Sequence, residues 1–116
     1  MQILMEWGSI MIDISEIRRL CGNNALRWTN HALVRLLKRN LNADDVIHAL
    51  MNGDIIEQYP SDYPYQSCLV LGTMIDKQAL HVVCGINSDE LWLITAYRPN
   101  LIKWTENFKT RKGNII

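Results

Sequence analysis

WTNHALVRLLKRN, residues 28–40, predicts the helix around which the rest of the chain is organised. At about 100° per residue, Leu33, Leu36 and Leu37 fall on one side, which we expect to face the core. Thr29 is the expected N-cap, because its hydroxyl can accept a backbone N–H of the first turn. The opposite side carries a cationic stripe made of His31, Arg35, Lys38 and Arg39.

This cationic stripe has two interpretations. A solvated face is what charged residues on a helix most often form. The alternative is a phosphate-binding face, since guanidinium groups are bidentate donors and a histidine exchanges protons near neutral pH. The alignment of His31 with Arg35 and Arg39 on successive turns makes the second interpretation worth testing.

Two further helices are indicated by their end signals. Asp13 or Ser15 can cap a short helix that Gly22 would end, and Asn23 and Asn24 then form a turn. The run NADDVIHALMNG, residues 42–53, has Asn42 as cap, aspartates in its first turn and Gly53 at its end. Because the central helix ends near Asn40, the central helix and the helix at 42–53 should form a hairpin with a very short connection.

From residue 54 the hydrophobic period changes from that of a helix to that of strands. The β-branched and aromatic runs are DIIEQY (54–59), SCLVLGTMI (67–75), ALHVVCGI (79–86) and LWLITAY (91–97). Their short connections favour an antiparallel meander, and Trp104 and Phe108 suggest a terminal helix or turn that packs on the sheet. The sequence therefore predicts an α+β fold with two or three N-terminal helices, a four-stranded antiparallel meander and a short C-terminal helix or turn.

Length and composition limit the classes of function. The 116 residues suit one domain, which we place at residues 27–112, preceded by an arm and short helix (1–26) and followed by a tail (113–116). Residues 1–10 could be an edge strand, a partner-contacting arm or sequence upstream of a start at Met11. Twelve basic and twelve acidic residues balance, so any nucleic acid must be attracted by a local surface.

The cysteines and the hydropathy pattern indicate the compartment. Cys21, Cys68 and Cys84 lack metal-ligand spacing, and the last two lie in apolar runs, which is typical of reduced core thiols. No apolar run approaches the ~20 residues of a membrane span. We expect a cytoplasmic protein without a cofactor, a metal site or a membrane partner.

The polar residues suit metal-independent RNA cleavage, which needs a base, an acid and cations that stabilise the phosphate. His31 and His81 are the candidates for proton transfer, with Arg35 as a clamp and Tyr97 close by. His81 is equally explained as an inner-strand histidine bonded to backbone or to Tyr59. The candidate nucleic-acid contacts are Arg35, Lys38, Arg39, Arg98 and Arg111.

Five motifs in order resemble a prokaryotic family of domains of unknown function. They are T-x-H-A-x-x-R-x-x-x-R (residues 29–39), G-[DE]-I-I-E-x-Y-P (53–60), S-C-L-V-L-G (67–72), L-H-V-V (80–83) and I-T-x-Y-x-P-x-x-x-x-W (94–104). They run from about residue 27 to residue 111. The resemblance implies a helix-then-sheet domain related to the RelE and BrnT toxin ribonucleases, with RNA as substrate and an antitoxin protein as partner.

Two classes of function follow. One is a type II toxin that acts as an endoribonuclease; the other is a non-catalytic module that binds nucleic acid or a protein through the basic helix. A homodimer is a further candidate assembly. Burial discriminates between the classes: an enzyme needs His31 and His81 in one solvent-open groove with Arg35, whereas a histidine sealed in the core favours the binding module.

Overall fold

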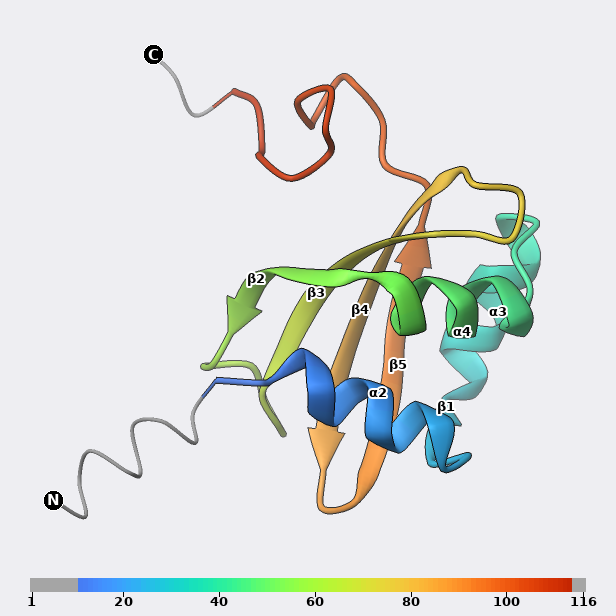
Figure 1. Cartoon of the computed structure of the whole chain (residues 1–116), viewed down its shortest axis with the longest axis vertical. Helices are drawn as coiled ribbons and strands as arrows, with labels where there is room; N and C mark the ends of the chain where they lie inside the picture. Colours follow the sequence, from blue (N-terminus) through green and yellow to red (C-terminus); the bar gives the residue numbers. More distant parts are fainter. Residues whose placement is uncertain (1–10, 114–116) are drawn as a thin grey trace, which may run out of the picture.

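A computed structural model describes residues 11–113, which form a layer of helices on one face of a sheet (Figure 1). The helices are α2 (Ile14–Gly22), α3 (Asn30–Lys38) and α4 (Ala43–Asn52). The strands are β1 (Leu26–Trp28), β2 (Asp54–Tyr59), β3 (Ser67–Thr73), β4 (Ala79–Asn87) and β5 (Glu90–Tyr97). The α+β prediction is confirmed, and the alternatives for residues 1–10 lie outside the described residues.

The sheet has the strand order β1-β5-β4-β3-β2. Strands β2 to β5 form the predicted antiparallel meander. Strand β1 was not predicted; it pairs in parallel with β5, and its Leu26 lies opposite Leu91. Three residues are too few to show an alternating pattern, so this strand is defined by its partner and not by its own sequence.

The predicted caps start the helices where expected. The side chains of Asp13, Thr29 and Asn42 accept N–H groups in the first turns of α2, α3 and α4. The end of α2 differs from the prediction, because Gly22 is still helical and the left-handed residue is Asn24, at φ 58°. Asparagine tolerates this conformation, and Asn40 takes it after α3 at φ 55°.

The main core lies between the helices and the sheet. Its fully buried members include Ile17, Leu20, Val46, Leu50, Val70, Leu80, Val82 and Leu93. Helix α4 packs closely on β3, since a Cβ added at Gly72 would lie 2.1 Å from the carbonyl oxygen of Ala49. Cys21, Cys68 and Cys84 are free and buried in this core, as predicted.

Helix α3 presents fewer residues to the core than its sequence predicts. Of the three leucines expected to face inward, Leu36 is buried, but Leu33 is 41% and Leu37 is 78% exposed. Helix α3 packs against β5 near one edge of the sheet, so its contact is a narrow stripe that Ala32 and Leu36 fill. The assignment of Leu33 and Leu37 to the core was wrong.

The other face of the sheet, here called the outer face, is partly covered by the segment 99–113. This segment forms turns, as the sequence allowed, and Trp104 within it makes an isolated β-bridge with Arg111. Trp104 is only 2% exposed. Figure 1 shows the segment at the top of the molecule, away from α2. In residues 11–113 no helix combines the length and apolarity needed to cross a membrane.

Candidate functional site

The cationic stripe predicted on α3, here called the cationic row, is exposed and begins in the first turn of the helix. His31, Arg35 and Lys38 are exposed, and none of the ion pairs found among residues 11–113 involves them. The helix has no acidic residue in its first turn. The positive charge of Arg35 and Lys38 is therefore available to an anionic ligand.

Arg39 continues this row from the helix to the sheet. Its guanidinium donates to Thr95 Oγ1 at 2.9 Å and to the carbonyl oxygen of Ala96 at 2.8 Å. In return, Arg98 donates to the carbonyl oxygens of Arg39, at 2.7 Å, and Asn40. The two arginines thus tie the end of α3 to β5, and Arg98 also satisfies carbonyls that the helix end leaves free.

His81 lies at the centre of the outer face, opposite Tyr97 on β5. It is 0% exposed, and both ring nitrogens have partners: Nδ1 is 3.2 Å from the hydroxyl of Tyr97, and Nε2 is 2.8 Å from the carbonyl oxygen of Phe108. Its ring packs edge-on against Trp104, with centroids 4.4 Å apart. Burial lowers the pKa of His81 and outweighs the bond to Phe108, which raises it.

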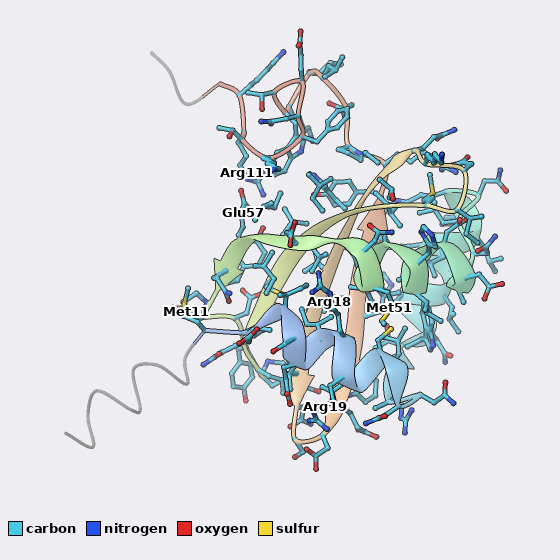
Figure 2. The ribbon with its side chains drawn as sticks, viewed as in Figure 1. Met11, Arg18, Arg19, Met51, Glu57 and Arg111 are labelled. Atoms are coloured by element: carbon cyan, nitrogen blue, oxygen red, sulfur yellow. The ribbon has the colours of Figure 1, made fainter. Side chains whose placement is uncertain are left out.

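An ion pair closes the outer face on the β2 side. Arg111 donates to both carboxylate oxygens of Glu57, at 2.9 and 3.0 Å, and Figure 2 shows the two side chains meeting between β2 and the C-terminal segment. Arg111 also lies over the ring of Trp104, 4.6 Å from its centroid. Burial raises the pKa of Glu57, but Arg111 and the hydrogen bond from Tyr59 together hold it below its usual value. Burial and the bond to Glu57 raise the pKa of Tyr59 to about 12.

The residues joined by these contacts, here called the outer-face cluster, are Glu57, Tyr59, His81, Tyr97, Trp104 and Arg111. Three of them, His81, Tyr97 and Arg111, were predicted from the sequence. Arg39 connects the cluster to the α3 row, since its charge acts on Tyr97: burial raises the pKa of Tyr97, while Arg39 and Arg111 lower it. His31 and Arg35 stay on the exposed side of α3, whereas His81 is sealed. The predicted pair of histidines therefore does not share an open groove.

Two cavities in the described part of the chain lie elsewhere. One, of about 710 Å³, is lined by residues that include Met11, Asp13 and Tyr65; the other, of about 610 Å³, lies along β2. Neither is lined by His31, Arg35, His81 or Tyr97. Residues 11–113 contain no group of three or more histidine, cysteine or acidic side chains placed to hold a metal ion.

Sequence reasoning missed Glu57 and Trp104 as members of the outer-face cluster. A signal for Glu57 was present, because Glu57 and Tyr59 alternate along one strand and must share a face. The sequence predicts a packing role for Trp104, which its burial confirms, but its contact with His81 depends on how the terminal segment folds back.

Comparison with known proteins assigns the chain to a family without assigning an activity. No curated protein and no solved structure matches it. The model of the family described as domain of unknown function (DUF4258) matches residues 28–98, which run from the last residue of β1, just before α3, to Arg98, just after β5. The chain therefore belongs to the DUF4258 family.

Proposed function

We propose that this domain is a non-catalytic module that binds single-stranded RNA. The main support for the proposal is the position of Arg39, which donates hydrogen bonds to Thr95 and Ala96 of β5. Through Arg39 the cationic row of α3 continues to the outer face of the sheet. Phosphates would contact Arg35 and Lys38, and the strand would continue toward Tyr97. The terminal segment, which covers part of the outer face, also carries exposed cations: Lys103, Lys109, Arg111 and Lys112.

The burial of His81 supports binding over catalysis. A general acid or base must come within hydrogen-bond reach of the proton it transfers, but both nitrogens of His81 are already bonded inside the protein. His81 thereby acts as a support for Tyr97 and for the terminal segment. Because the chain has no net charge, RNA affinity must come from the local row of cations.

Fluorescence anisotropy with an end-labelled single-stranded RNA oligonucleotide tests this proposal. Changing Arg35→Gln together with Lys38→Gln should remove most of the affinity and reduce the salt slope by about 0.7 for each phosphate that these side chains neutralise. Arg19→Gln with Lys77→Gln is the matched control, because it removes the same charge from α2 and from the β3–β4 turn. Equal affinity and slope in the wild type and the α3 variant would contradict the proposal.

A metal-independent endoribonuclease is the second candidate, favoured by the acid-base groups gathered on the outer face. Glu57 would be the base, since its lowered pKa keeps it ionised, and Arg111 would stabilise the phosphate once released from Glu57. The resemblance to RelE and BrnT toxins supports this candidate, and an antitoxin would then be the partner.

RNA incubated with the protein in chelator distinguishes the two candidates. An endoribonuclease should give products ending in a 2′,3′-cyclic phosphate, and Glu57→Gln should slow cleavage by about 10² to 10⁴ while RNA is still bound. His31→Ala and His81→Ala test the pair expected from the sequence. Binding without cleavage would leave the RNA-binding module as the function.

A further inference from the structure

The outward side of α3 carries apolar residues as well as cations. Leu33, Val34 and Leu37 are 41%, 48% and 78% exposed, and here we call them the α3 strip. Scattered exposed apolar residues are ordinary, but three at positions i, i+1 and i+4 of one helix form a continuous stripe. Burial of such a stripe by a partner would be favourable.

The α3 strip and the cationic row face different parts of the molecule. Placed at about 100° per residue, Arg35 and Arg39 fall on the side of α3 that turns to the outer face of the sheet, where Arg39 reaches Thr95. Leu33 and Leu37 fall on the other side, toward the helix layer. A partner on the α3 strip can therefore leave His31, Arg35 and Arg39 free, and of the cationic row it would contact only Lys38, which borders Val34.

The next helix carries a surface of complementary charge. On α4, Asp44, Ile47 and Met51 point outward together, and here we call them the α4 strip. Ile47 is 37% and Met51 is 43% exposed. Asp44 takes part in none of the ion pairs found among residues 11–113. Figure 1 shows α3 and α4 meeting at one end of the helix layer, and Figure 2 shows Met51 on the side of α4 toward α2.

We propose that these two strips form the interface of a homodimer. In a two-fold arrangement, the α3 strip of each copy packs on the α4 strip of the other, and Lys38 of one copy lies opposite Asp44 of its partner. A second copy is the occupant that the described residues favour, because this chain carries both the basic half and the acidic half of the pairing: α4 has acidic residues in its first turn and no basic residue in its last.

Sedimentation equilibrium of the purified protein tests the interface. The wild type should be dimeric, and Leu37→Asp should weaken the dimer at least tenfold without unfolding the monomer, because Leu37 makes little contact within its own chain. Ile102→Asp is the matched control, since Ile102 is 86% exposed but lies in the terminal segment. A monomeric wild type, or an equal effect of both variants, would overturn the proposal.

Charge exchange tests the orientation of the two copies. Lys38→Asp and Asp44→Lys should each weaken dimerisation by roughly tenfold, because each replaces two symmetric attractions with repulsions. The double variant should recover most of the affinity, since the pair is restored with its signs reversed. Circular dichroism of each variant checks that α3 and α4 remain folded. A double variant weaker than both single variants would overturn the proposed pairing.

Discussion

At the scale of a single residue, His81 shows how a polar group is accommodated under a cover of aromatic rings. The carbonyl of Phe108 can only accept, so Nε2 of His81 carries the proton and donates to it. Nδ1 then accepts from the hydroxyl of Tyr97. The neutral ring has both nitrogens satisfied, which is why a buried histidine is tolerated between two strands.

This arrangement predicts that the protein loses stability in mild acid. Because the pKa of folded His81 is lowered, the unfolded chain takes up a proton first as the pH falls through about 6.5. The His81 contribution is therefore fully present above that pH and is lost below it. Denaturant unfolding at about pH 7.5 and about pH 5.5 should show a lower free energy of unfolding in acid.

His81→Gln provides the control, since it removes the titrating group and keeps a polar side chain of similar reach. The difference in unfolding free energy between the two pH values should shrink in this variant. Glu57 does not confuse the comparison, because its lowered pKa places its own loss of stability at more acidic pH. A pH difference of the same size in both proteins would show that His81 is not responsible.

At the scale of an element, α3 shows what a local pattern can and cannot predict. Its cap, Thr29, and its span depend on neighbouring residues, so they could be read from the sequence. Its inward side could not, because a helix that packs mainly on one strand, β5, near the edge of the sheet buries fewer apolar residues than the three leucines offer. Strand β1 was missed for a similar reason, since only its pairing with β5 defines it.

The same limit applies to the candidate site. Alternation alone can place His81 and Val83 on one face of β4, and the register with β5 places Tyr97 beside His81. The groups that accept hydrogen bonds from the side chains of Arg39, Arg98 and Arg111 are 52 to 59 residues away in the sequence, so no local pattern indicates them. Long side chains at the ends of elements take their roles from tertiary packing.

Two leucines on α3 test the corrected orientation of this helix. Leu36→Ala should lower the free energy of unfolding by about 2 to 5 kcal/mol, because Leu36 is only 3% exposed. Leu37→Ala should change it by less than about 0.5 kcal/mol in dilute solution, since Leu37 lies mostly in solvent. Chemical denaturation measures both values. A larger cost at Leu37 than at Leu36 would mean that the helix is rotated from the orientation described.

At the scale of the whole molecule, the sheet is packed on both faces but by different means. The helices cover one face with aliphatic side chains, whereas the outer face is partly covered by a segment without regular structure. That segment is held by the ion pair of Arg111 with Glu57 and by the hydrogen bond from the ring Nε2 of His81 to the carbonyl oxygen of Phe108. Its aromatic residue, Trp104, fills the space over His81. The outer face is thus held both by the packing of Trp104 on His81 and by a network of polar interactions.

If the segment 99–113 is part of the folded core, Trp104 should contribute as much to the free energy of unfolding as a buried residue of the helix layer does. Trp104→Ala should lower the free energy of unfolding by about 3 to 5 kcal/mol, because it removes a large ring that is 2% exposed. Ile102→Ala, two residues earlier in the same segment, should cost less than about 0.5 kcal/mol. Far-ultraviolet circular dichroism during denaturation measures both without depending on tryptophan fluorescence. Equal free energies of unfolding for the two variants would show that the segment contacts the sheet without stabilising the fold. Exposure of His81 to solvent would then require little free energy.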